Sequence, residues 1–169
     1  MKKSSYIYLD ELFSDLLLVR DVMEFKSELE KLKADLYEIR GNIDEKLAHN
    51  FSGVQAEGWK RLFVAEDVGQ DDPTQYLRCV KEVERILDDL PRVTLVLAHN
   101  MPHRIVRRIS DWFASNFRKR VILDIQVDPE NLGGVVVLDK GHYHDYSLTR
   151  KLEEMAEKGE LQLSRLFEA

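Results

Sequence analysis

The sequence predicts an α+β protein in which a long, coiled-coil-like N-terminal helix is followed by a small β-α-β-β-α domain. Residues 10–50 contain no proline and a single glycine, and their apolar residues recur at helical spacing. After residue 91 the apolar residues alternate as they do in strands, and helical stretches interrupt this alternation. This order of elements predicts a helical region joined to a compact α+β domain.

The long helix is expected over residues 1–50, where apolar residues repeat at alternating steps of three and four. This a/d spacing favours a coiled coil, in which one narrow seam faces a neighbouring helix. We therefore expect the seam to be a partner interface; the alternative is a long amphipathic helix folded back onto its own domain. Gly41 weakens the helix by about 1 kcal/mol relative to alanine and marks its end or a bend. The seam consists of Val22, Phe25, Leu29, Leu32, Leu36, Ile39 and Ile43.

Glycines and a proline interrupt the next stretch and set the expected domain boundaries. Residues 51–73 are expected to form a linker with a short helix around Trp59–Ala65. Residues 74–158 are expected to form the α+β domain, because helical and strand periods alternate there. Residues 159–169 are left as a C-terminal tail.

Within the α+β domain, changes in apolar period define the elements. A wide apolar stripe predicts a helix up to Leu90, and Pro91 ends it. The β-branched run of residues 93–98 predicts a largely buried strand. The other predicted elements are a helix over residues 101–117, strands over residues 121–127, 135–138 and 142–146, and a last helix from Ser147 to Lys158.

Composition and charge exclude several classes of function. The net charge is −6, which argues against a nucleic-acid binder, since such proteins need cations to displace the counterions around phosphates. No apolar run approaches the ~20 residues that span a bilayer, and acidic residues follow the basic start, unlike in a signal peptide. We therefore expect a soluble, cytoplasmic protein that reaches the membrane only through partners. The single cysteine, Cys79, excludes an internal disulfide and is expected to be a buried helix residue rather than a reactive thiol.

Four short motifs follow one another in the second half of the chain. They are a basic turn, Arg118-Lys119-Arg120, then Val127-Asp128-Pro129, Leu132-Gly133-Gly134 and Asp145-Tyr146-Ser147-Leu148. Their physical roles are architectural, because Asp-Pro ends strand pairing and paired glycines allow a positive φ. In this order the motifs resemble the signature region of the delta subunit of F-type ATP synthase, called the oligomycin-sensitivity-conferring protein in mitochondria. The resemblance covers roughly residues 80–157, and Tyr146 stands where that family usually has glycine.

The resemblance implies a non-catalytic peripheral-stalk (stator) subunit of a rotary ATP synthase. Its α+β domain would bind the C-terminal ends of the membrane-anchored b subunits and would hold the catalytic head still against rotation. The family also carries an N-terminal six-helix bundle of about a hundred residues that holds the tips of the alpha subunits, whereas fewer than eighty residues precede the match here. The resemblance implies no cofactor and no nucleic-acid partner, and a position peripheral to the inner or plasma membrane.

Two other functions compete with this one. A long helix followed by an α+β head with a Gly-Gly strand is similar to the E-type stalk protein of V/A-type ATPases. The heptad seam alone would suit a self-associating coiled-coil adaptor with no connection to ATPases. For docking in the head domain, we expect exposed apolar residues of the helix over residues 101–117 to be used.

Histidines and arginines raise two further possibilities. His142 and His144 share one face of an expected strand, Asp145 is adjacent, and His99 and His103 would complete a metal cluster. This segment lies on an expected hairpin, where exposed polar residues are ordinary, so we expect no metal site and no catalytic residue. A basic cluster suits either a solvated helix face or a patch for an acidic partner helix or, less well, for an RNA backbone; its members are Arg104, Arg107, Arg108, Arg118, Lys119 and Arg120.

Overall fold

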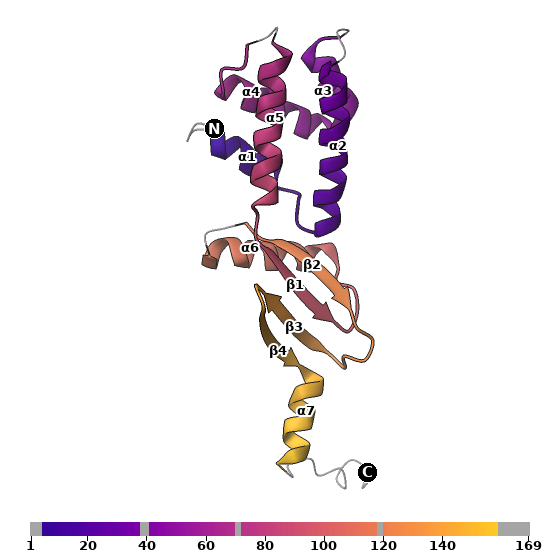
Figure 1. Cartoon of the computed structure of the whole chain (residues 1–169). Coiled ribbons are helices and arrows are strands. Elements are labelled where there is room, and N and C mark those ends of the chain that lie inside the picture. The colour runs from indigo at the N-terminus through magenta and orange to yellow at the C-terminus, as the bar shows by residue number, and fades with distance from the viewer. Residues whose placement is uncertain (1–4, 38–40, 70–71, 118–119, 159–169) are drawn as a thin grey trace. The chain divides into compact units, whose positions relative to one another are not determined.

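The computed structural model describes residues 5–37, 41–69, 72–117 and 120–158, which fall into two compact units (Figure 1). Unit 1 comprises residues 1–90 and unit 2 residues 91–169. In the described residues unit 1 is helical, and unit 2 combines a four-stranded mixed sheet with two helices. The α+β class and the order of elements in the second half are as predicted. No helix among the described residues is long and apolar enough to cross a membrane.

Unit 1 is a bundle of medium-length helices, and the prediction of one long N-terminal helix is wrong. Asp21 caps α2 by accepting hydrogen bonds from the amides of Leu17 and Leu18, at 3.1 and 2.9 Å. After α2, Gly41 adopts a φ of +89°, and Asn42 forms a reciprocal capping box with Glu45 that starts a new helix. The helices are α1 (Tyr6–Leu12), α2 (Val19–Tyr37), α3 (Ile43–Asn50), α4 (Gly53–Ala65) and α5 (Pro73–Asp88).

The stretch expected to be a linker contains α4, which lies in the centre of the bundle. Ser52 and Gln55 form a second capping box that begins this helix. Trp59 and Leu62 have no exposed surface, so the helix is part of the core. A chain of aromatic rings crosses this core with successive centroids 4.8–6.2 Å apart, and its members are Phe13, Phe25, Phe51, Trp59, Phe63 and Tyr76.

Unit 2 is built around a sheet of order β2-β1-β3-β4, in which β1 is parallel to β2 and antiparallel to β3. Helix α6 connects the parallel strands and packs against the sheet at β2 (Figure 1). The inward side chains of β1, Val93, Leu95 and Leu97, are buried, as their alternation predicts. The elements are β1 (Arg92–Leu97), α6 (His103–Phe117), β2 (Ile122–Val127), β3 (Gly134–Asp139), β4 (His142–Ser147) and α7 (Leu148–Glu157).

Candidate partner-binding surfaces

The heptad seam lies inside unit 1. Five of its members, Val22, Phe25, Leu29, Leu32 and Leu36, are 0–4 % exposed and pack within the bundle. Ile43 is the half-buried first residue of α3, and Ile39 lies outside the described residues. The structure therefore gives the seam an intramolecular role, and its use as an interface with another chain stays a prediction.

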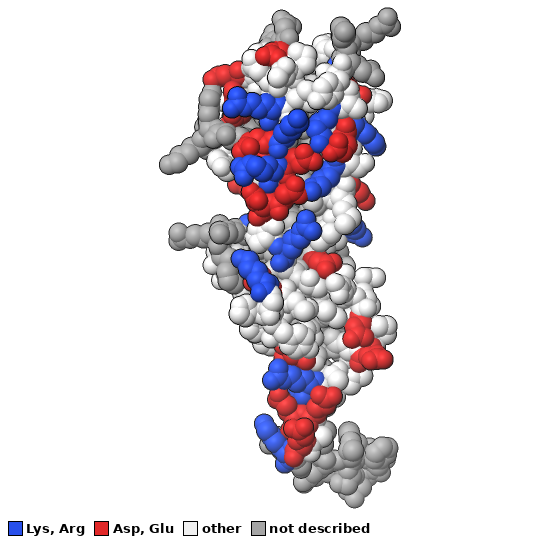
Figure 2. Space-filling model, viewed as in Figure 1, with Lys and Arg blue, Asp and Glu red and all other residues white. Residues whose placement is uncertain are grey.

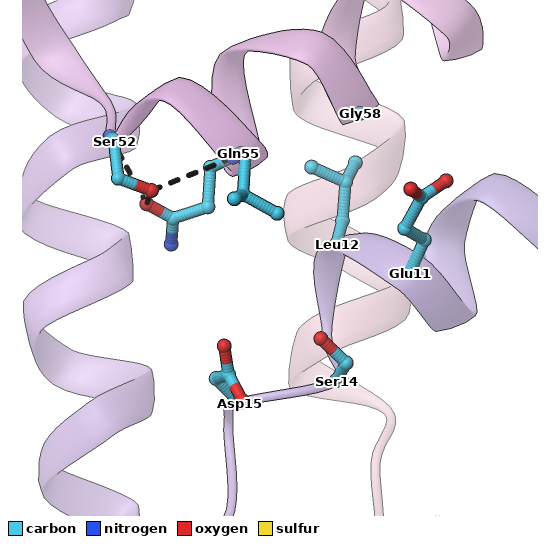
Figure 3. Close-up of a pocket in the computed structure, with 8 residues that line it drawn as sticks. Glu11, Leu12, Ser14, Asp15, Ser52, Gln55 and Gly58 are labelled. Atoms are coloured by element: carbon cyan, nitrogen blue, oxygen red, sulfur yellow. Dashed lines mark hydrogen bonds between the residues drawn. The ribbon is translucent and has the colours of Figure 1, made fainter.

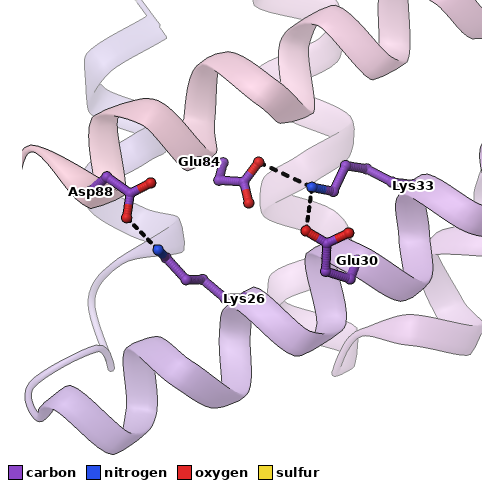
Figure 4. A network of polar contacts seen from close by, with 5 residues as sticks. All are labelled: Lys26, Glu30, Lys33, Glu84 and Asp88. Atoms are coloured by element: carbon purple, nitrogen blue, oxygen red, sulfur yellow. Dashed lines mark hydrogen bonds and ion pairs between the residues drawn. The ribbon is translucent and has the colours of Figure 1, made fainter.

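A polar network on the outside of the bundle joins α2 to α5 (Figure 4). Lys33 donates to Glu84 at 3.1 Å and to Glu30 at 2.5 Å, and Lys26 is paired with Asp88. Burial acts to lower the pKa of Lys33, but the hydrogen bonds and charges of both glutamates outweigh it, so this pKa is raised. Figure 2 shows charged side chains of both signs gathered over unit 1. The pairs of Lys33 with Glu84 and of Lys26 with Asp88 are structural contacts that join α2 to α5.

Three of the four family-like motifs, those at residues 127–129, 132–134 and 145–148, meet at one end of the sheet, where β2 ends, β3 begins and β4 leads into α7. The amide of Asp128 donates to the Leu97 carbonyl at 2.8 Å, which ties the end of β2 to β1. The amide of Leu148 donates to the Gly133 carbonyl at 2.8 Å, which ties the start of α7 to the loop before β3. Together these bonds fix the direction in which α7 leaves the sheet.

Side chains reinforce the same junction. Ser147 caps α7 by accepting from the Arg150 amide at 3.2 Å, and Asp145 accepts from the Ser147 amide at 2.8 Å. Hydrogen bonds from Ser147 hold the pKa of Asp145 below its ordinary value. Sequence reasoning missed two contributors, Asn131, which accepts from the Gly133 amide at 3.0 Å, and Thr149, which accepts from the Leu132 amide. The Asn-x-Gly spacing is the local signal that indicates such a turn.

Gly134 is required at this junction by its surroundings. Its φ is +79°, and a Cβ added there would lie 2.4 Å from the carbonyl oxygen of Tyr146 and 3.0 Å from the Ser147 Cα. The backbones of β3 and β4 therefore approach each other more closely than a side chain allows. This explains the second glycine of the Leu132-Gly133-Gly134 motif.

Apolar side chains are exposed around the same junction. Leu132 is 65 %, Tyr146 66 % and Leu148 44 % exposed. Helix α7 contacts β4 and has no buried residue among those described, although Leu148, Leu152 and Met155 recur along it at helical spacing. Figure 2 shows a largely uncharged surface over the sheet on the face in view. We call the exposed Leu132, Tyr146 and Leu148, together with the half-buried Leu152 and Met155, the junction surface; it has the apolar character of a binding surface.

Helix α6 supplies a second exposed aromatic group, as expected for the helix over residues 101–117. Trp112 is 54 % exposed and meets the half-buried Phe113 edge-on, with centroids 5.1 Å apart. Its neighbours Val106 and Ser110 are buried, so the helix turns a different side toward the sheet. Of the expected basic cluster, Arg104 and Arg108 are exposed on this helix, whereas Arg118 and Lys119 lie outside the described residues.

Two hollows occur in unit 1 within the described residues. The smaller, of about 160 Å³, is lined by Glu11, Ser14, Asp15, Ser52 and Gln55 among others (Figure 3). Its Ser52 and Gln55 are engaged in the capping box of α4, and Glu11 pairs with Arg61 at 3.1 Å, so the polar groups have structural partners. The larger is a groove of about 840 Å³ among α2, α3, α4 and α5. Val64, which is 76 % exposed, is one of the residues that line it.

The metal cluster that the sequence raised as a possibility does not assemble among the described residues. Among the described residues, no group of three or more His, Cys, Asp and Glu side chains is placed to hold a metal ion. Asp145 lies on the opposite face of β4 from His142 and His144, while His99 follows β1 and His103 is the first residue of α6. Cys79 is buried, and this burial raises the pKa of its thiol to about 12, which suits a structural residue.

A helical bundle and an α+β unit joined in one chain, with exposed apolar side chains and polar pairs that link helices, are features typical of a subunit that packs against other proteins. Residues 74–158 match the family described as ATP synthase delta (OSCP) subunit, and the chain belongs to this family. By family it is a non-catalytic ATP synthase subunit of the peripheral stalk. The match decides the resemblance in favour of delta over the E-type stalk protein and over an adaptor unrelated to ATPases.

The chain is also similar to chains in solved structures. A chain in the cryo-EM structure of the Toxoplasma gondii mitochondrial ATP synthase hexamer is similar over 93 % of this chain and 97 % of that chain. The two chains share 12 % identity, and the TM-score is 0.31. No curated protein sequence matches the chain.

Proposed function

We propose that the protein links the catalytic head of a rotary ATP synthase to the membrane-anchored b subunits. The observation that carries this proposal is that the family match covers the motifs that direct α7 away from the sheet. A subunit that resists torque needs a stiff scaffold and apolar interfaces. Unit 1 has a continuous core, and unit 2 exposes apolar groups at the junction surface.

Each unit is assigned one side of the link. The junction surface of unit 2 would bind the C-terminal helices of the b subunits, because an amphipathic helix without a covered apolar stripe suits packing against another helix. Unit 1 would contact the alpha subunits, in the place of the family's N-terminal bundle. Its five described helices make it a shortened bundle rather than a stalk helix, which supports this assignment.

The test is a pull-down of the tagged full-length chain from native membranes, with co-purifying subunits identified by mass. The proposal expects the alpha, beta and b subunits. Tyr146→Ala should reduce recovery of b, and Tyr143→Ala is the matched control, since both tyrosines are exposed, at 66 % and 61 %, on opposite faces of β4. If both variants lose the b subunits equally, or both retain them equally, the junction surface is not the surface that binds b.

A second pair of variants separates the two sides of the link. Val64→Glu changes the larger groove of unit 1, while Val54→Glu, on the same helix and similarly exposed, lies away from that groove. Loss of alpha and beta with b retained is expected only for Val64→Glu. Recovery of the protein alone from native membranes would contradict the link and favour self-association.

A further inference from the structure

The hairpin of β3 and β4 presents two histidines side by side on an edge strand. His142 and His144 are two residues apart on β4, so their side chains leave the same face of the sheet. Both are exposed, their ring centroids are 6.5 Å apart, and the ring planes differ by 21°. No described strand pairs with the outer edge of β4. Solvent therefore reaches two roughly parallel imidazoles.

We propose that His142 and His144 together chelate one late first-row divalent cation, such as Zn²⁺, Ni²⁺ or Cu²⁺. Imidazole nitrogen is a preferred ligand of these ions, with a metal–nitrogen bond of about 2.0–2.1 Å. The ion must lie in the plane of each ring, because the lone pair of an imidazole nitrogen lies in that plane. The two ring planes are now roughly parallel with centroids 6.5 Å apart, so both rings turn about their side-chain torsions to direct one nitrogen each at a shared ion.

The hairpin holds this pair in place before any ion binds. Lys140 and Gly141 form its two-residue turn with φ values of +47° and +84°, which is the geometry of a tight hairpin turn. Directly across from His142 stands Asp139, whose carboxylate adds a negative charge on the same face. Because the strand spacing is set by the turn and the ladder, binding requires side-chain adjustment and leaves the backbone in place.

The neighbouring acidic residue Asp145 does not take part. It lies on the other face, where its carboxylate accepts from the Ser147 amide at 2.8 Å and from the Tyr143 hydroxyl at 3.2 Å. Since the described residues supply no third ligand, water completes the coordination. The site is therefore an open chelate that takes up and releases its ion readily, unlike a closed structural zinc site.

The experiment is a calorimetric titration of the full chain, without a polyhistidine tag, with Zn²⁺ and with Ni²⁺ as chloride salts. The expected result is one ion per chain, with affinity reduced about ten-fold or more by His142→Gln or by His144→Gln. His103→Gln, which changes an exposed histidine on α6, is the matched control and should bind as the unchanged chain does. Because all three residues are exposed, the variants are expected to fold.

Location is tested separately from stoichiometry. Addition of Cu²⁺ in less than equimolar amount should broaden the NMR amide signals of β3 and β4 before those of the rest of the chain. Absence of binding, or binding that either histidine variant leaves unchanged, would overturn the proposal. Broadening centred on His99 and His103 would overturn it as well, by placing the ion elsewhere.

Discussion

Gly134→Ala is expected to destabilise unit 2 more than any other glycine-to-alanine change with a positive φ in the described chain. An L-residue pays about 1–2 kcal/mol for the left-handed backbone that Gly134 adopts. The added Cβ also meets the Tyr146 carbonyl oxygen at 2.4 Å, well inside van der Waals contact, so β3 and β4 must separate there. This separation strains the bond from the Leu148 amide to the Gly133 carbonyl, whose loss costs about 1 kcal/mol. We expect a total cost of about 3 kcal/mol.

Gly141→Ala provides the matched control for this change. Gly141 has a similar φ of +84°, but an added Cβ has no atom within 4 Å. Gly141→Ala should therefore lower the free energy of unfolding by the backbone contribution alone, about 1–2 kcal/mol. The difference between the two variants measures the close approach of β3 and β4, with backbone strain removed from the comparison.

The assay is urea unfolding followed by the NMR indole signals, because each unit contains one tryptophan. Trp112 reports unit 2 and Trp59 reports unit 1. In Gly134→Ala the folded Trp112 signal should disappear at a lower urea concentration than in the unchanged chain, and this shift should be larger than in Gly141→Ala. The Trp59 signal should disappear at the same urea concentration as in the unchanged chain. Equal costs for the two variants, or an equal shift of both signals, would refute the reasoning.

Three further predictions concern unit 1. Leu29→Ala should lower the free energy of unfolding by about 3 kcal/mol independently of protein concentration, whereas Met23→Ala, at an exposed position, should lower it by less than about 0.5 kcal/mol. A loss that depends on protein concentration would indicate an intermolecular seam instead. Cys79 should resist alkylation at pH 8 until the chain unfolds, and rapid labelling of the native chain would contradict its burial. Its neutral thiol should contribute its full stabilisation below pH 9, and this contribution should fall progressively as the pH rises to about 12. Gly53→Ala, at the open first turn of α4, should raise the free energy of unfolding by about 0.5–1 kcal/mol. A lower melting temperature of this variant would contradict the start of α4 at this residue.

Local chemistry was sufficient to predict the α+β unit. Alternating β-branched residues predict strands. Pro91 and the Asp128-Pro129 pair each mark the end of an element, because proline lacks an N–H. The paired glycines also indicated a backbone constraint before the structure showed the approach of Gly134 to Tyr146. The Asn42 and Glu45 capping box was an equally local signal, and reading it would have divided the predicted long helix.

The sequence by itself determined that residues 22–36 carry a narrow apolar stripe on a helix, and that residues 127–148 carry the motifs of the delta family. Only the tertiary structure decided what covers each apolar group. A three-four spacing is the same for a coiled coil and for a helix packed inside its own bundle, because it specifies a face and not the helix that meets it. Leu29 is therefore buried by its own unit, whereas Leu148, on a stripe of the same kind, stays 44 % exposed.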